Sequence, residues 1–193
     1  MRRTPRRLRS RLRVETLLEA AAQVFEREGL DATTDRIAER TGYSVGTLYQ
    51  YFPDKHAMLY APAERHLDQA AQALEDVSER LDRERPDVEG TLRAVAAAMV
   101  GLHSDRPRLH ALMSAHAPRV PEGVARLDEL RAALVAALAA HPVRCGHGGP
   151  DPARTAALLV HTADSQLPGV LLGAGDAEEA LGRSLLASSS AAR

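Results

Sequence analysis

Aromatic residues, cysteine and long apolar runs are all scarce in this sequence. Only 3% of its 193 residues are aromatic and none is tryptophan, so a hydrophobic core must be built from Leu, Ala and Val. The one cysteine, Cys145, cannot form a disulfide within the chain, which argues against a disulfide-stabilised secreted domain. No apolar run reaches the roughly 18 residues of a membrane span, and no apolar segment follows the basic N-terminus as in a secretory signal. We therefore expect a soluble cytoplasmic protein with no membrane partner.

Alternating β-branched residues are also lacking, which argues against a sheet. The composition favours helices, and 45% apolar residues are enough for a buried core. The expected fold is all-α, with a basic flexible arm (1–12), a helix-turn-helix DNA-binding domain (13–60) and a helical regulatory and dimerisation domain (61–188). The arm has six arginines and no acidic residue, which suits either a solvated arm or contacts along DNA.

Signatures of enzymes and of metal sites are missing as well. The sequence has no phosphate-binding glycine loop and no nucleophile elbow. Its eight histidines include no pair at ligand spacing on one helix face with a carboxylate partner. His141, Cys145 and His147 lie close together in a glycine-rich stretch, which we interpret as a surface loop. The sequence thus predicts no catalytic residue, no metal ion and no cofactor.

What the sequence does contain is a series of three short helical patterns in residues 13–59. Apolar residues at spacings of three and four mark the first pattern, which ends at Gly29. The second begins at Thr33 or Thr34, since either hydroxyl can cap free amides. It ends at Gly42, which supplies the positive φ of a tight turn. Two helices joined by such a turn are typical of a helix-turn-helix DNA reader.

The third pattern, residues 45–50, is short and carries no charge, and Ser44 is its expected cap. Small or polar side chains at the N-terminal end suit a helix that enters the major groove of DNA. Gly46 lets the backbone approach closely, and Thr47 offers a methyl group and a hydroxyl to base edges or phosphate. Lys55, the only lysine of the chain, follows at the start of a fourth helix, where a phosphate would relieve its conflict with the helix dipole.

Residues 41–52 read Thr-Gly-Tyr-Ser-Val-Gly-Thr-Leu-Tyr-Gln-Tyr-Phe and resemble the DNA-binding domain of TetR-type transcriptional regulators. In that family the third helix enters the major groove and the start of the fourth touches the DNA backbone. The side chains that the resemblance places near bases are Val45, Gly46 and Thr47. Those that it places near phosphates are Thr33, Tyr49, Tyr51 and Lys55. Further contacts implied around the third helix are Tyr43, Ser44 and Gln50.

The same resemblance places Ile37, Leu48 and Phe52 in the core. One departure from the family lies before the second helix, where the loop is shorter by one residue. It leaves open whether the capping threonine reaches a phosphate.

Helical patterns continue through the rest of the chain. The expected helices cover residues 54–81, 87–103, 107–117, 121–141, 152–172 and 176–187. The expected caps are Asp54, Asp151 and Asp176, because an aspartate precedes each of these helices or lies at its start. Prolines are expected to interrupt the first of these helices at Pro62 and to kink the fifth at Pro168.

The resemblance implies that the last two helices pair with their copies in a second subunit. The expected dimer interface is an alanine-rich face with added apolar and acidic positions: Ala153, Ala156, Ala157, Val160, Asp164 and Leu167. A pocket for a small ligand would be lined by Met99, His103, Leu112, Met113 and His116. Ordinary core filling is the alternative for each of these five residues.

Together these features predict a DNA-binding transcriptional regulator and not an enzyme. The expected protein is a homodimeric repressor that a small apolar ligand releases from a near-palindromic double-stranded DNA operator. The alternative is a DNA-binding regulator without a small ligand, controlled by its abundance or by a protein partner.

Overall fold

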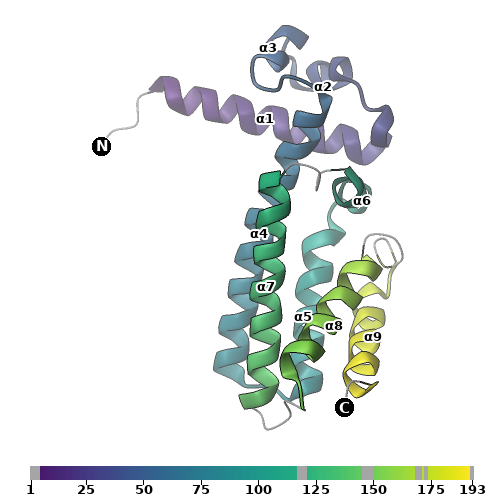
Figure 1. Ribbon diagram of the computed structural model, residues 1–193. Coiled ribbons are helices and arrows are strands. Elements are labelled where there is room, and N and C mark those ends of the chain that lie inside the picture. The colour runs from purple at the N-terminus through teal and green to yellow at the C-terminus, as the bar shows by residue number, and fades with distance from the viewer. Residues whose placement is uncertain (1–4, 117–120, 145–149, 168–170, 172–173, 192–193) are drawn as a thin grey trace. The chain divides into compact units, whose positions relative to one another are not determined.

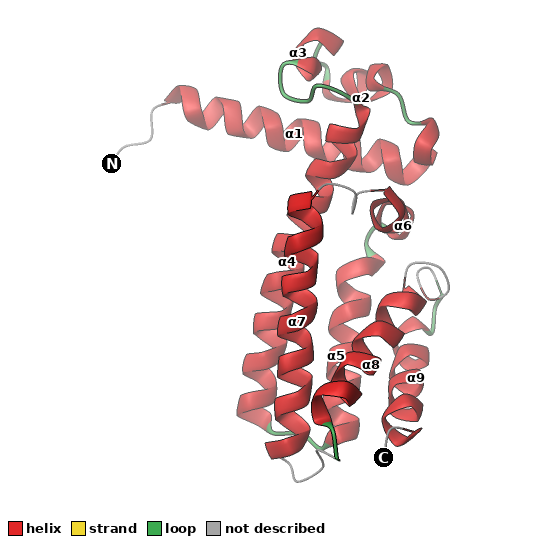
Figure 2. Cartoon of the chain, in the orientation of Figure 1, coloured by secondary structure: helices red, strands yellow, loops and turns green. Residues whose placement is uncertain are grey.

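The computed structural model describes residues 5–116, 121–144, 150–167, 171 and 174–191. Every regular element in these residues is a helix (Figure 2), so the all-α expectation is confirmed. The chain divides into two compact units. Unit 1 contains Met1–His66 and Arg108–Arg119, and unit 2 contains Leu67–Pro107 and Val120–Arg193. None of the described helices is long and apolar enough to cross a membrane.

Unit 1 holds the N-terminal helices and most of α6 (Figure 1). Its elements are α1 (Pro5–Glu28), the 3-10 turn η1 (Gly29–Asp31), α2 (Thr34–Thr41), α3 (Val45–Tyr49), the first part of α4 (Lys55–Glu84) and α6 (Pro107–His116). One apolar cluster forms their core, and it includes the predicted core residues Ile37, Leu48 and Phe52. Leu109 and Met113 of α6 belong to the same cluster. The division therefore differs from the expected boundary at residue 60, because α6 packs with the DNA-binding helices.

Helix α1 begins at Pro5, inside the segment that we expected to be a flexible arm. Proline suits the first turn of a helix because its missing amide is not needed there. Arginine, which fills much of residues 6–13, has a high helix propensity. Arg11 and Arg13 are exposed at this end of α1.

Unit 2 is made of the rest of α4 and four further helices. These are α5 (Val88–Ser104), α7 (Pro121–Arg144), α8 (Pro152–Gln166) and α9 (Ala177–Ala191). Helix α8 contacts both α7 and α9, and α5 contacts α9. Their shared core contains Leu92, Ala96, Leu181 and Leu185, each at most 2% exposed.

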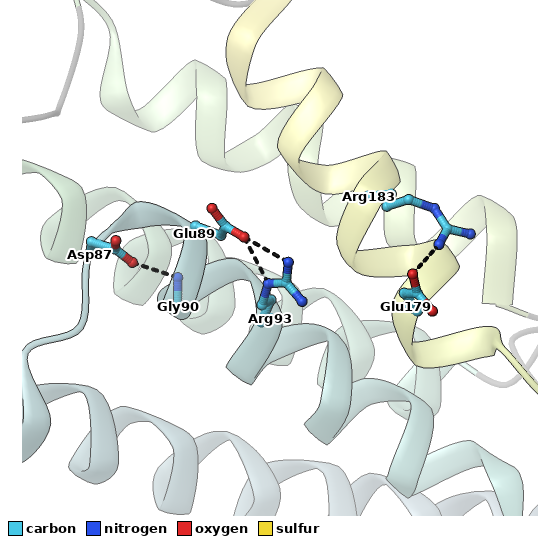
Figure 3. A network of polar contacts seen from close by, with 6 residues as sticks. All are labelled: Asp87, Glu89, Gly90, Arg93, Glu179 and Arg183. Carbon is cyan, nitrogen blue, oxygen red and sulfur yellow. Dashed lines mark hydrogen bonds and ion pairs between the residues drawn. The ribbon is translucent and has the colours of Figure 1, made fainter.

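Figure 3 shows polar contacts of α5 and α9 that each lie within one helix or at its start. Asp87 caps α5 by accepting a hydrogen bond from the Gly90 amide at 2.8 Å. Arg93 pairs with Glu89 on α5 at 2.7 Å, and Arg183 pairs with Glu179 on α9 at 2.6 Å. Exposed pairs one turn apart contribute only about 0.3–0.5 kcal/mol. The packing of α5 on α9 therefore depends mainly on the apolar core.

Helix ends depart from expectation in three places. Helix α4 runs unbroken from Lys55 to Glu84 with Pro62 buried inside it, so this proline does not end the helix. Helix α8 ends at Gln166, short of residue 172, although Leu167 after it still has helical angles, with φ of −59° and ψ of −53°; Pro168 itself lies outside the described residues. Helix α9 extends to Ala191, beyond the expected end at residue 187.

Candidate DNA-binding surface

The turn between α2 and α3 is shaped by a threonine cap and a glycine. Thr33 caps α2, and its Oγ1 accepts a hydrogen bond from the Arg36 amide at 3.3 Å. The structure thus selects Thr33 over Thr34. Gly42 ends α2 with a φ of 70°, a left-handed conformation that suits glycine. These two local features set the start of α2 and the point where the chain turns toward α3.

Helix α3 buries one side chain, Leu48, and exposes small and polar residues on its other sides. Leu48 is 0% exposed in the core of unit 1, which fixes the rotation of this short helix. Gly46, Tyr49 and Gln50 are exposed on the remaining sides. Since α3 contains no acidic or basic residue, it can approach base edges without placing a carboxylate near phosphate.

Ser44 and Thr47 form a small polar unit at the start of α3. Ser44 caps the helix as expected, with its Oγ accepting from the Thr47 amide at 3.1 Å. The two hydroxyl oxygens lie 2.9 Å apart and share a hydrogen bond. This bond orients the Thr47 side chain, so its methyl group and its hydroxyl hold set positions at the end of the helix that would read DNA.

Two of the expected phosphate anchors, Tyr49 and Lys55, contact residues at or just before the start of α2. Tyr49 Oη lies 3.4 Å from Thr34 Oγ1, and Lys55 Nζ donates a hydrogen bond to the Leu30 carbonyl oxygen. Asp54 caps α4 as expected, accepting from the Ala57 amide at 2.8 Å. An ammonium group has three donors, so Lys55 can bind a phosphate while it keeps its hydrogen bond to Leu30. The structure thus brings Tyr49 of α3 and Lys55 of α4 close to the start of α2.

Three of the partly buried residues among the expected DNA contacts pack against the apolar core. Tyr43, Val45 and Tyr51 pack against the core of unit 1. Each side chain offers only part of its surface to a ligand. For the two tyrosines, this fits a phenol whose ring is packed while the hydroxyl is available to a phosphate.

Helix α2 carries two arginines that contact α1. Arg36 is exposed and pairs with Glu28 at 2.8 Å. The hydrogen bond and the charge of Glu28 both raise the pKa of Arg36, so this guanidinium stays cationic. Arg40 donates a hydrogen bond to the Gln23 side chain on α1. Both arginines are thus tied to α1.

Helix α6 is fastened to α1 by a contact that sequence reasoning missed. The Glu26 carboxylate accepts hydrogen bonds from the Leu109 amide at 2.7 Å and the Arg108 amide at 3.4 Å. Arg108 also donates to the Arg27 carbonyl oxygen at 2.8 Å and lies over Gly29. A Cβ at Gly29 would come within 2.8 Å of that guanidinium, and its φ of 63° also favours glycine. The sequence contains no signal for this contact, because the two segments are far apart in the chain.

The expected dimer residues on α8 do not share one environment. Ala156, Val160 and Leu167 are at most 2% exposed and belong to the core of unit 2 within a single chain. Asp164 is partly buried and pairs with Arg131 of α7 at 2.6 Å. Only Ala153 is fully at the surface, with Ala157 intermediate. The alanine-rich face is therefore already largely covered by the chain's own helices.

The outward side of α8 carries a different set of residues. These residues, spaced three or four apart, are Arg154, Leu158, His161 and Ser165. Leu158 is 48% exposed, which makes it one of the few large apolar side chains at the surface of the described residues.

The expected pocket residues divide between the two units. Leu112 and Met113 pack in the core of unit 1, and His116 is exposed at the end of α6. Met99 packs against the core of unit 2. His103 is half-buried and its Nδ1 lies 2.6 Å from the Met99 carbonyl oxygen. Burial lowers the pKa of His103, and the Met99 hydrogen bond and the charge of Asp164 offset part of this shift.

The sequence of the helix-turn-helix region matches a known family. Residues 17–61 match the family model described as "Bacterial regulatory proteins, tetR family". No match was found among curated proteins.

Solved structures share the fold over nearly the whole chain. A TetR/AcrR-family regulator from Thermobifida fusca superposes with a TM-score of 0.71 at 20% identity, covering 94% of this chain and 98% of that one. The TetR-family regulator PfmR from Thermus thermophilus gives a TM-score of 0.70 at 22% identity, with 89% and 96% covered. FadR from Bacillus subtilis, solved in complex with stearoyl-CoA, gives 0.65 at 19% identity, with 92% and 98% covered.

Proposed function

We propose that this chain, whose residues 17–61 match the model of the tetR family of bacterial regulatory proteins, is a homodimeric repressor of transcription that binds a near-palindromic operator. Its solved structural neighbours are regulators and not enzymes, and no catalytic role is assigned to any residue here. The protein would act on chromosomal DNA in the cytoplasm.

The construction of α3 is the observation that carries this proposal. A capped, uncharged helix is anchored by Leu48 and exposes Gly46, Tyr49 and Gln50. Thr47, held by Ser44, would read a base edge together with Val45. Tyr49, Tyr51 and Lys55 would contact phosphates on either side of the groove, with Thr33 at the α2 end. A buried anchor with an exposed face of small and polar side chains is compatible with insertion into a groove.

A twofold assembly would place two copies of α3 on two half-sites. One such helix contacts only a few base pairs, so a dimer is needed for a site long enough to be specific. Helices α8 and α9 are the proposed contact, as expected from the sequence. Burial of Val160 and Leu167 in the single chain moves the proposed contact to the outward side of α8. Leu158, with Arg154, His161 and Ser165, would face the partner there.

Release by a small apolar ligand remains the proposed mode of regulation. The structure of FadR from Bacillus subtilis contains stearoyl-CoA, which makes long acyl chains one class of candidate. Met99 and His103 of α5 are the proposed pocket residues, both in unit 2. Ligand binding would weaken operator binding by a coupling of about 1–3 kcal/mol. Control by abundance or by a protein partner is the alternative.

Selection of bound fragments from a random DNA library tests this proposal directly. The full chain should enrich one near-palindromic sequence, with two half-sites about one helical turn apart. Fluorescence anisotropy on that sequence would then be repeated with a panel of small molecules that includes stearoyl-CoA. Enrichment of no sequence would overturn the DNA-binding role. Enrichment without release by any compound would favour the alternative mode of control.

A further inference from the structure

Two histidines from different helices meet inside unit 1. His66 lies on α4 and His110 on α6, and their ring centroids are 4.3 Å apart with the ring planes tilted by 56°. His110 is 8% exposed and His66 is partly buried. Core residues of the unit lie on the same two helices within three positions of the histidines: Ala63 on α4, and Leu109 and Met113 on α6. The pair therefore occupies a largely dry position and not a solvated surface.

The ring nitrogens of this pair are close enough to share one ion. A ligand nitrogen of His66 and one of His110 lie within 4.8 Å of each other. An ion midway between them would be at most about 2.4 Å from each, and zinc–imidazole bonds are about 2.0–2.1 Å long. A small rotation of either ring would close this difference. Neutral imidazoles are good ligands for zinc, copper and nickel, whereas magnesium and calcium prefer oxygen.

We infer that His66 and His110 bind a divalent transition-metal cation that joins α4 to α6. These two imidazoles supply two of the four ligands of a tetrahedral zinc site. With water or an exchangeable anion at the remaining positions, the ion would bind reversibly and the site would respond to the metal concentration.

A metal ion bound by His66 and His110 would link α4 to α6 inside unit 1. Helix α4 starts beside α3 and carries Lys55, while α6 is fastened to α1 by Glu26. A metal bridge between α4 and α6 would restrict movement of α4 against α1. Metal binding itself does not depend on the proposed function. An effect of metal on operator affinity does rest on it, and the two are measured separately.

Metal binding is tested on the full-length chain after removal of metal by a chelator. A Cys145→Ser background removes the only native thiol. Isothermal titration with Zn²⁺ should show one ion per chain, and Co²⁺ should give visible d–d absorption. His66→Asn and His110→Asn should each weaken Zn²⁺ binding by tenfold or more. His56→Asn, an exposed histidine on the same helix α4, should leave the Zn²⁺ affinity unchanged.

A ligand exchange separates coordination from packing. His110→Cys should retain Co²⁺ binding and add a near-ultraviolet thiolate-to-cobalt band, because a thiolate replaces the imidazole as ligand. Circular dichroism checks that each variant is folded. The inference is overturned if the wild-type chain binds no Zn²⁺ at micromolar concentration, or if the Asn variants bind as tightly as the wild type. It is also overturned if the Cys variant, folded, shows no charge-transfer band. Operator affinity with and without Zn²⁺ is the separate measurement, and its invariance would exclude only the regulatory effect.

Discussion

Lys55 offers the sharpest test of how this protein would hold DNA. Its ammonium group donates to the Leu30 carbonyl oxygen beside the start of α2, where we propose that a phosphate binds. Lys55→Met removes the charge and keeps most of the aliphatic stem. Removing the charge that neutralises one phosphate should change the slope of log K against log salt by about 0.9. A dimer carries two copies of Lys55, so the slope should become shallower by about 1.8.

The measurement is fluorescence anisotropy of labelled operator at several KCl concentrations. Affinity should fall to a similar extent for every DNA sequence tested, because a phosphate contact carries no sequence information. Arg65→Gln is the matched control, since Arg65 is an exposed cation on the same helix several turns further on. The control should leave the slope close to that of the wild-type chain.

The hydrogen bond to Leu30 must be separated from the phosphate contact, because Lys55→Met removes both. A hydrogen bond of this kind contributes about 0.5–1.5 kcal/mol to stability, which urea unfolding in the absence of DNA will measure. Partial unfolding lowers the fraction of active protein but does not alter the salt slope. The reasoning is refuted if Lys55→Met leaves the slope unchanged, or if it changes which bases are preferred.

Three further changes test other parts of the structure. Thr47→Ala should relax the preference at one position in each half-site, at about 1–3 kcal/mol per half-site; Thr47→Val separates a methyl contact from a hydroxyl contact, and an unchanged selection profile for both would exclude base reading. Glu26→Ala removes the acceptor at the start of α6 and should lower the free energy of unfolding by about 0.5–2 kcal/mol, whereas Glu15→Ala at an exposed position of α1 should change it by less than about 0.5 kcal/mol; equal decreases would contradict the capping role. Leu158→Asp should shift the chain from dimer to monomer in sedimentation and weaken operator binding, while Gln69→Asp on the exposed face of α4 should do neither; a stable dimer of the Leu158 variant would place the interface elsewhere.

Local rules allowed much of unit 1 to be predicted from sequence. The caps Thr33, Ser44 and Asp54 each depend on a hydroxyl or carboxylate within three residues of the amide it binds. The left-handed turn at Gly42 depends on one residue type. Because such interactions involve only neighbouring residues, a short stretch of sequence indicates them, although it did not distinguish Thr33 from Thr34 as the cap of α2.

Contacts between distant segments could not be predicted in this way. The apolar face of α8 was recognised, but the pattern cannot say whether it is covered by the same chain or by a second copy. Val160 and Leu167 turned out to be covered by the chain's own helices. Likewise, His66 and His110 lie on different helices, so a search for ligand spacing within one helix could not pair them.

The division into units gives α4 and α6 a particular role in any regulation. The chain passes from one unit to the other inside α4, at residues 66 and 67, and at both ends of the α6 segment. A change in unit 2 can therefore reach the DNA-reading helices through the covalent continuity of α4 and through the α6 segment. Glu26 of α1 binds the first amides of α6. Next to it, the Arg108 guanidinium lies against Gly29, four residues before Thr33. A displacement of α6 would thus move the segment between Gly29 and Thr33, which positions the start of α2. Tyr49 and Lys55 form hydrogen bonds with residues at this end of α2. Weakening this attachment should leave DNA reading intact while reducing the response of the operator complex to any effector bound in unit 2.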